Sequence, residues 1–348
     1  MRSVAIVMLL VGVFRTTPVL ADDWFPVAVQ ADGASMQYLP LAKATKIWRI
    51  CALLPHGKDH YWWGVAWGLS EEASRLGVML GIYEAGGYDQ PDKQRLQLQQ
   101  CRQKQADAYI IAAIAANGLS QELQQLAAAG IPVIDLINGM DGDYITSHSV
   151  VSFTDMAVTA LRYIKQQAGK PFRLGWFPGP NGAAWVRDAE QGVKSLVQQG
   201  DITLYHGGYG PTDAFHQAGL IRQFYQNHSS VDYVLANAVA AKAVAQFQLR
   251  NPASQSPIVA YYANPAVIEM LQTQQLAAAV TDSPVLQARI AVDLAVRSLQ
   301  GESVPKKVSP HIEVLTASNL ASFDLSRLLP PDEQWIIRRE LLDEPVGH

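Results

Sequence analysis

Residues 48–88, WRICALLPHGKDHYWWGVAWGLSEEASRLGVMLGIYEAGGY, contain the repeating unit that decides the fold. The apolar run at residues 48–54 is typical of a buried strand, and Pro55 ends it. Residues 61–76 carry apolar side chains at helical spacing, and Gly77 supplies the left-handed residue that often follows a helix. A second apolar run follows at residues 78–84. The stretch therefore predicts a strand, a helix and another strand.

The same alternation continues along most of the chain. Because the expected strands are apolar throughout, both faces of each sheet should be covered, which indicates parallel strands. The pattern restarts after residue 152, so we expect an α/β protein with two doubly wound parallel-sheet halves. Further strands are expected at residues 108–112, 131–136, 172–177, 202–206, 231–236, 257–262 and 277–280. Further helices are expected at residues 91–104, 119–129, 156–167, 184–199, 214–227, 240–249, 265–271 and 283–299.

The N-terminus has the pattern of a cleaved signal peptide at residues 1–21. Arg2 precedes a short apolar run, and Val19-Leu20-Ala21 fits the small-residue cleavage pattern. The apolar run is too short to span a bilayer comfortably, and Arg15 ends it, so no membrane insertion is expected. A core helix is the alternative, but no amphipathic pattern continues after Ala21. We expect cleavage near Ala21 and a periplasmic location.

Export also bears on the two cysteines of the chain, Cys51 and Cys101. In an oxidising compartment an isolated pair is more often bridged than free, so a disulfide is expected. Two buried thiols are the alternative. A bridge would close a loop of about 50 residues and stabilise the fold by on the order of 4 kcal/mol.

Composition and motifs argue against several classes of function. The net charge of -4 gives no basic face for nucleic acid. The chain has no phosphate-binding glycine loop, no nucleophile elbow and no zinc or Cys-x-x-Cys motif. His56 and His60 have no third ligand spaced nearby, so neither a metal nor a cofactor is expected. A hydrolase using His60 and Asp59 would lack a nucleophile. The pair Glu71-Glu72 is expected on an exposed helix face. We expect a binding protein rather than an enzyme.

Aromatic residues follow several expected strands, at the edge where open parallel sheets bind ligands. Tyr61 and Trp62 open the first helix, Tyr88 follows the second strand, and Tyr262 ends a strand of the second half. Aromatic faces attract a methylated cationic nitrogen, while hydroxyl and indole groups donate hydrogen bonds to an oxygen. Asp59 would add a negative charge beside the cation. Simple packing of these rings in the core is the alternative.

A sugar site would also use aromatic rings, with a denser set of polar groups to satisfy many hydroxyls. Arg187, Asn237 and Asp282 also lie after expected strands and are additional candidates for the cleft. The substrate-binding component of an ABC sugar importer therefore stays open as an alternative function.

Two motifs, KDHYW at residues 58–62 and EAGGY at residues 84–88, resemble a known family. It is the family of periplasmic proteins that detect trimethylamine N-oxide (TMAO) for a membrane sensor histidine kinase, and the likeness runs from about residue 48 to residue 315. The resemblance implies a type I periplasmic binding protein fold with a hinge and a ligand cleft between two lobes. The implied segments are an N-terminal arm at 22–45, an N-terminal lobe at 46–152 plus 281–306, a C-terminal lobe at 153–280 plus 307–330, and a tail at 331–348.

The resemblance further implies a ligand box formed by Asp59, Tyr61, Trp62, Tyr88 and Tyr262. A tryptophan of the family's box falls at Phe153 here, which keeps an aromatic wall but loses an indole N–H. The implied ligand is TMAO or a related methylated amine, and the implied partner is the periplasmic domain of the kinase. Ligand bridging the two lobes would shift a hinge equilibrium. The arm at 22–45, expected outside the regular fold, is a candidate kinase contact.

Overall fold

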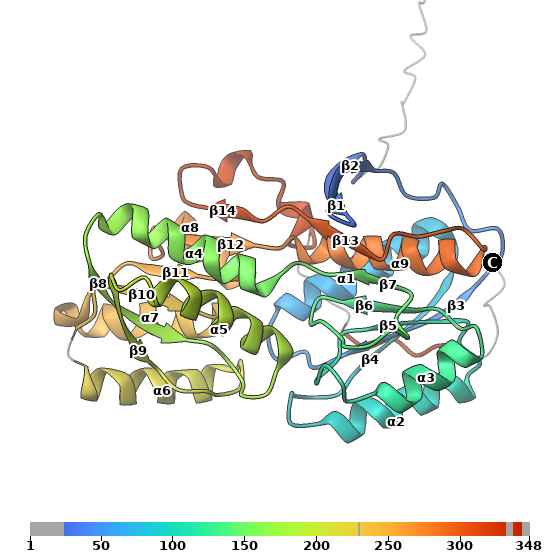
Figure 1. Cartoon of the computed structure of the whole chain (residues 1–348), viewed down its shortest axis with the longest axis horizontal. Coiled ribbons are helices and arrows are strands. Elements are labelled where there is room, and N and C mark those ends of the chain that lie inside the picture. Colours follow the sequence, from blue (N-terminus) through green and yellow to red (C-terminus); the bar gives the residue numbers. More distant parts are fainter. Residues whose placement is uncertain (1–23, 229, 332–336, 343–348) are drawn as a thin grey trace, which may run out of the picture.

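The computed structural model describes residues 24–228, 230–331 and 337–342, so the expected signal peptide at 1–21 lies outside the described residues. The chain forms two lobes, each built on a mainly parallel sheet with helices on both faces (Figure 1). Across those described ranges, every helix is too short or too polar to cross a bilayer. The predicted α/β fold with two doubly wound halves is confirmed.

The N-lobe contains an eight-stranded sheet in the order β2-β1-β13-β7-β6-β5-β3-β4. Five of its parallel strands come from the first part of the chain, before it enters the C-lobe. They are β3 (Arg49–Leu54), β4 (Met79–Glu84), β5 (Ala108–Ile111), β6 (Val133–Leu136) and β7 (Ser147–Ser149). Two helices that pack on each other cover one face, α1 (Tyr61–Leu76) and α9 (Pro284–Leu299). The other face carries α2 (Pro91–Gln103) and α3 (Ser120–Ala128), seen below the sheet in Figure 1.

The C-lobe contains a six-stranded sheet in the order β14-β12-β11-β10-β8-β9. The strands are β8 (Phe172–Phe177), β9 (Ile202–His206), β10 (Tyr233–Ala236), β11 (Ile258–Ala260), β12 (Ala278–Thr281) and the antiparallel β14 (Glu313–Leu315). The helices are α4 (Phe153–Ala168), α5 (Ala184–Val197), α6 (Ala214–Asn227), α7 (Ala238–Arg250) and α8 (Pro265–Gln272). Short 3₁₀ turns lie at η1 (Pro252–Ser254), η2 (Leu320–Ser322) and η3 (Leu325–Arg327).

The long amphipathic elements agree best with the sequence. The predicted bounds of α1, β8, β9 and α6 match the structure residue for residue. Elements that the sequence pattern did not show are β1, β2, β7, β13 and β14, which are only three to five residues long. Such short strands offer too few positions for a period to appear.

The N-terminal arm is part of the sheet, so the prediction that residues 22–45 lie outside the regular fold was wrong. β1 (Val27–Ala31) and β2 (Ala34–Tyr38) form a hairpin, and β1 pairs antiparallel with β13 (Lys307–Pro310). The hairpin turns at Asp32-Gly33, both with positive φ, which is a typical hairpin dipeptide. Tyr38 Oη then donates to Asp293 Oδ2 of α9 at 2.6 Å. The arm is therefore anchored to the N-lobe.

The third crossing between the lobes comes later than predicted. Residues 307–330 were expected in the C-lobe, but β13 pairs in parallel with β7 of the N-lobe, and β14 is the first part to join the C-lobe sheet. The described part of the tail, 337–342, returns to the N-lobe. There Arg339 exchanges backbone hydrogen bonds of 2.7 and 2.9 Å with Ile82, on the edge strand β4.

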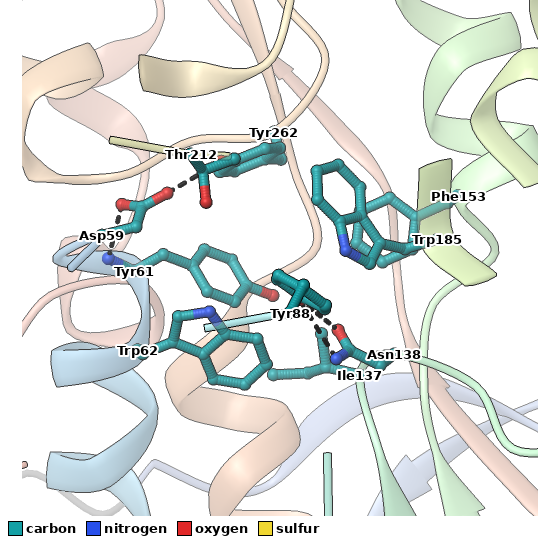
Figure 2. Close-up of a pocket in the computed structure, with 10 residues that line it drawn as sticks. All are labelled: Asp59, Tyr61, Trp62, Tyr88, Ile137, Asn138, Phe153, Trp185, Thr212 and Tyr262. Carbon is teal, nitrogen blue, oxygen red and sulfur yellow. Dashed lines mark hydrogen bonds between the residues drawn. The ribbon is translucent and has the colours of Figure 1, made fainter. Parts of the chain in front are cut away.

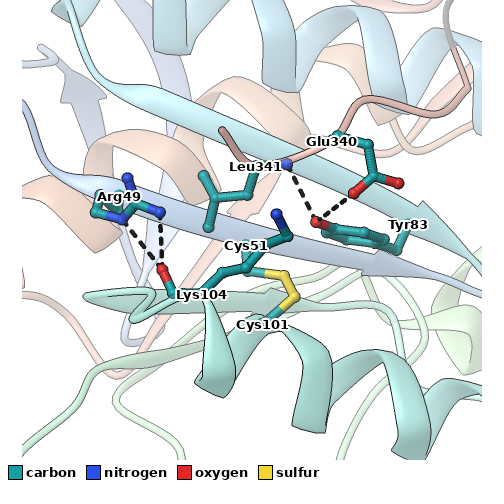
Figure 3. Close-up of a disulfide and its surroundings, with 7 residues drawn as sticks. All are labelled: Arg49, Cys51, Tyr83, Cys101, Lys104, Glu340 and Leu341. Atoms are coloured by element: carbon teal, nitrogen blue, oxygen red, sulfur yellow. Dashed lines mark hydrogen bonds between the residues drawn. A yellow bond between two sulfur atoms is a disulfide. The ribbon is translucent and has the colours of Figure 1, made fainter. Parts of the chain in front are cut away.

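The predicted disulfide is present and joins β3 to α2 through Cys51 and Cys101 (Figure 3). Both cysteines are fully buried in an apolar cluster that Leu341 of the tail completes. Leu341 N donates to Tyr83 Oη at 3.1 Å. Covalent and non-covalent links therefore hold the same edge of the N-lobe sheet.

Glu72 corrects the expectation that the pair Glu71-Glu72 is exposed. Its side chain is fully buried between α1 and α9, while Glu71 is exposed. It accepts a hydrogen bond from Trp24 Nε1 at 2.8 Å and one from Arg75 Nε at 3.0 Å. Buried carboxylates need such partners to offset the loss of hydration.

Candidate functional site

The carboxyl ends of the strands of both lobes face each other across a cleft, and a small cavity lies between them (Figure 2). Its volume is about 20 Å³, little more than the space that one water molecule needs. Ten residues line it: Asp59, Tyr61, Trp62, Tyr88, Ile137, Asn138, Phe153, Trp185, Thr212 and Tyr262. All six residues predicted for the ligand box are among them.

Asp59 links the two lobes. Its Oδ1 accepts a hydrogen bond from the backbone N–H of Tyr61 at 3.0 Å, which holds the carboxylate at the start of α1. From the C-lobe, Tyr262 Oη donates to Oδ2 at 2.7 Å and Asn264 Nδ2 donates to Oδ1 at 2.8 Å. One buried carboxylate thus accepts hydrogen bonds from both sides of the cleft.

Tyr61 is positioned by Asp282, one of the additional candidates. Tyr61 Oη donates to Asp282 Oδ2 at 2.6 Å, and Gln287 Nε2 donates to the same oxygen at 2.7 Å. Burial raises the pKa of Tyr61 well above its ordinary value and also raises the pKa of Asp282. Asp282 holds the hydroxyl of Tyr61 and is not part of the cavity wall, so its role is to orient that side chain.

Tyr88 is held from the N-lobe by Asn138, which follows β6. Asn138 Nδ2 donates to Tyr88 Oη at 3.1 Å and to the backbone oxygen of Ala113 at 2.8 Å. Burial raises the pKa of Tyr88, so its phenol stays protonated at neutral pH.

The C-lobe contributes a continuous set of rings. Trp185 lies near the start of α5, with its ring centroid 5.5 Å from that of Phe153 and 5.8 Å from that of Tyr262. The Tyr262 ring in turn lies 5.5 Å from Tyr61 of the N-lobe in an edge-to-face arrangement. These separations are typical of attractive aromatic pairs. The rings of the two lobes therefore enclose the cavity together.

Four wall residues were not predicted as binding residues: Ile137, Asn138, Trp185 and Thr212. Asn138 and Trp185 do lie in segments that follow strands, which was the available signal. Trp185 also needs Gly179, because a Cβ there would come within 2.7 Å of its ring. Thr212 lies in a loop without any period, so sequence pattern carried no signal for it.

Two additional candidates are not brought into the site. Arg187 is exposed and its Nε pairs with its neighbour Asp188 at 3.0 Å. Asn237 is buried but caps α7, since its Oδ1 accepts from the backbone N–H of Ala240 at 2.9 Å. Both positions follow strands, yet their side chains point to solvent or to a helix end.

A larger cavity of about 440 Å³ lies next to the site and shares Tyr88 and Thr212 with it. His56 lines this larger cavity, and its Nε2 lies 3.4 Å from Thr212 Oγ1 across the cleft. Burial lowers the pKa of His56 to about 4, so the ring is neutral at pH 7. Within the described residues, no three His, Cys, Asp or Glu side chains are grouped to hold a metal ion.

Sequence comparison assigns residues 51–303 to a periplasmic binding protein domain. This chain belongs to the periplasmic binding protein family. The periplasmic protein TorT of Escherichia coli K12 is 33% identical over 290 residues, which cover 83% of this chain and 84% of that protein. TorT of E. coli O157:H7 is 32% identical, with 94% of each chain covered. The predicted resemblance is confirmed, and the family implies a periplasmic protein; cleavage at Ala21 stays a prediction.

Solved structures give the same assignment. A solute-binding protein of an ABC transporter from Bradyrhizobium sp. BTAi1, with bound Bis-Tris, has a TM-score of 0.79 and 36% identity, covering 93% of this chain and all of that one. TorT in complex with the TorS sensor domain and in the presence of TMAO has a TM-score of 0.74 and 26% identity, covering 82% of this chain and 98% of that one.

Proposed function

We propose that this protein binds TMAO or a closely related methylated amine between its lobes and signals to a membrane sensor histidine kinase. The observation that carries the proposal is the cavity itself, in which aromatic rings from both lobes surround a space beside the carboxylate of Asp59 (Figure 2). The similarity to TorT over most of both chains supports it, as does the solved complex of TorT with the TorS sensor domain.

The walls fit the chemistry of an amine oxide. Its methyl groups spread a positive charge that aromatic faces attract, and the tyrosine and tryptophan rings offer several such faces. Asp59 adds a full negative charge at one end. The small volume also favours a ligand of few heavy atoms, because a hexose has more than twice as many as TMAO and would force the lobes apart.

Signalling follows from the way the lobes meet. Asp59 and Tyr61 belong to the N-lobe, whereas Tyr262, which donates a hydrogen bond to Asp59 and packs edge-to-face against Tyr61, belongs to the C-lobe. A ligand that touches both walls is bound better when the cleft is closed, and this differential affinity shifts the hinge equilibrium. A kinase sensor domain in contact with both lobes would read the new arrangement.

Calorimetry on the mature protein tests the ligand, with TMAO, trimethylamine, glycine betaine and a panel of pentoses and hexoses. We expect saturable binding of TMAO and none of the sugars. Copurification with the sensor domain of the kinase, with and without TMAO, tests the partner. Tight binding of a sugar without any response to methylated amines would remove the proposal.

The second candidate is the substrate-binding component of an ABC importer, including the sugar importer that the sequence left open. It is favoured by the relative from Bradyrhizobium, whose bound Bis-Tris is a tertiary amine with several hydroxyl groups. Ligand-dependent stimulation of a permease, with no complex formed with a sensor domain, would favour this candidate over the first.

A further inference from the structure

The indole N–H of Trp185 is a buried donor without a partner. Trp185 is 4% exposed and lines the cavity, and no described residue accepts a hydrogen bond from its Nε1. The hydroxyl of Tyr88 interacts with the indole, but outside hydrogen-bond geometry, and it exchanges its own hydrogen bonds with Asn138. Leaving such a donor unpaired costs free energy, so a buried orphan at a cavity wall points to an acceptor that arrives with a ligand.

The hydroxyl and amide donors around the cavity are already used. Tyr61 Oη donates to Asp282, and both Tyr262 Oη and Asn264 Nδ2 donate to Asp59. Phe153, which packs against Trp185, has no donor at all. A ligand oxygen placed at this end of the cavity would therefore meet the N–H of Trp185 first.

The two ends of the cavity also differ in polarity. Figure 2 shows the carboxylate of Asp59 at one end and the indole of Trp185 at the other, with the rings of Tyr61 and Tyr262 between them. A negative charge at one end and a hydrogen-bond donor at the other match a dipolar ligand, with its cationic nitrogen toward Asp59 and its oxygen toward Trp185.

The indole is held in place before any ligand binds. Its ring packs on Gly179 and lies 5.5 Å from Phe153, 5.8 Å from Tyr262 and 6.2 Å from Tyr261. Tyr261 is itself fixed, since its hydroxyl donates to the backbone oxygen of Pro178. A donor that needs no reorientation contributes more to affinity because less freedom is lost on binding.

We propose that Trp185 Nε1 recognises the ligand's oxygen, so that the site selects methylated nitrogen compounds that carry an acceptor over bare quaternary ammonium ions. The inference rests on the proposed function, because it assumes that a methylated nitrogen occupies this cavity. It assigns Trp185 a specificity-determining role and names dipolar N-oxides as the favoured ligand class.

The test compares TMAO with tetramethylammonium, which has the same methylated nitrogen but no acceptor. Trp185→Phe keeps an aromatic ring and removes the N–H. We expect its affinity for TMAO to fall at least tenfold and its affinity for tetramethylammonium to change less than threefold. Phe153→Leu is the matched control, because it removes a neighbouring ring that carries no donor, and it should weaken both ligands by similar factors.

A second measurement uses the unaltered protein, so that it does not depend on the variant folding. The indole N–H resonance of Trp185, assigned by its loss in Trp185→Phe or by selective labelling, should move downfield with TMAO but not with tetramethylammonium. Equal losses for both ligands, or an indole resonance that ignores TMAO, would overturn the role of Trp185 alone. Failure of the unaltered protein to bind either ligand would overturn the proposed function as well.

Discussion

The two walls of the cavity are built in different ways. Half of the N-lobe wall comes from one short stretch, with Asp59, Tyr61 and Trp62 at the start of α1, and this stretch supplies the negative charge. The C-lobe wall comes from separate segments that carry Phe153, Trp185, Thr212 and Tyr262, and it supplies ring surface and the unpaired donor. One lobe thus provides a compact motif, whereas the other provides a surface that exists only after folding.

The sheets that carry these walls are also stabilised differently. The N-lobe sheet is extended by the β1–β2 hairpin, closed at its edge by residues 337–342 and cross-linked by the Cys51–Cys101 bond. The chain has no other cysteines, so the C-lobe has no such covalent link. The difference indicates that the N-lobe is the more firmly braced of the two.

The largest expected effect concerns the disulfide, which only the N-lobe sheet has. Replacing both cysteines, Cys51→Ala with Cys101→Ala, removes a link across about 50 residues and should lower the free energy of unfolding by roughly 4 kcal/mol. Urea denaturation followed by tryptophan fluorescence measures it. Ligand affinity at low denaturant should stay unchanged, because the bond lies outside the cavity. A loss below 1 kcal/mol would contradict the idea of a reinforced N-lobe.

Asp59 tests the charged wall. Asp59→Asn removes the negative charge that accepts hydrogen bonds from Tyr262 and Asn264, and should weaken ligand binding by about 3 kcal/mol, since hydrogen bonds to charged groups are the strong ones. Calorimetry with TMAO measures it. Asp89→Asn, at the wall of the larger cavity, is the control and should change affinity less than twofold. Similar losses in both variants would mean a diffuse charge effect.

Acid pH should weaken the contact between the two lobes at His56. Burial lowers its pKa to about 4, below the ordinary value of 6.5, so the structure in which His56 is buried favours the neutral ring. The closed state is therefore fully stable above pH 6.5 and loses stability as the pH falls from 6.5 toward 4. At pH 5 the affinity should be lower than at pH 7 by roughly 2 kcal/mol, if the ring is solvated in the open state.

His56→Gln provides the comparison for this pH dependence. Glutamine keeps a polar side chain beside Thr212 but does not titrate between pH 7 and pH 5, so the affinity of this variant should be nearly constant there. The other charged groups that act on His56 are Asp59, Lys58, Asp213 and Asp89. The same acid loss in His56→Gln would assign the effect to one of them.

The smallest effects compare the ring surfaces directly. Trp62→Ala on the N-lobe wall and Tyr262→Ala on the C-lobe wall should each weaken the ligand by about 1–2 kcal/mol if both rings face the cation. Arg187→Ala, on the exposed side of α5, should leave affinity within twofold. Unchanged affinity in both ring variants would dispose of the aromatic box, whereas a loss in only one would locate the cation against that lobe.

The candidate residues show how far sequence reasoning reaches. Asp59, Tyr61, Trp62 and Tyr88 follow N-lobe strands closely, so the rule that ligands bind beyond strand ends found them. The same rule also selected Asn237, which caps a helix instead. Position after a strand brings a residue to the correct edge of the sheet, but the side-chain direction depends on the next turn of backbone.

The hairpin and the buried Glu72 are features that the sequence did not predict. The sequence contains a hairpin signal at Asp32-Gly33, but the flanking strands are too short to show a period that would support it. Glu72 looked like a solvated charge because α9, whose Arg289 lies 3.5 Å from it, follows more than two hundred residues later. Burial of a polar residue by a distant element leaves no local pattern to recognise.

The sequence alone determined the alternation of strands and helices, the two halves and the pair of cysteines, because these depend on local periodicity and composition. Only the tertiary structure decided which side chains face one another across the cleft. Trp185 joins Phe153 and Tyr262 because the crossover after β7 and the connections after β8 and β11 meet at the same edge of the C-lobe sheet. Long-range packing brings such residues together, and no spacing along the chain encodes the distance between them.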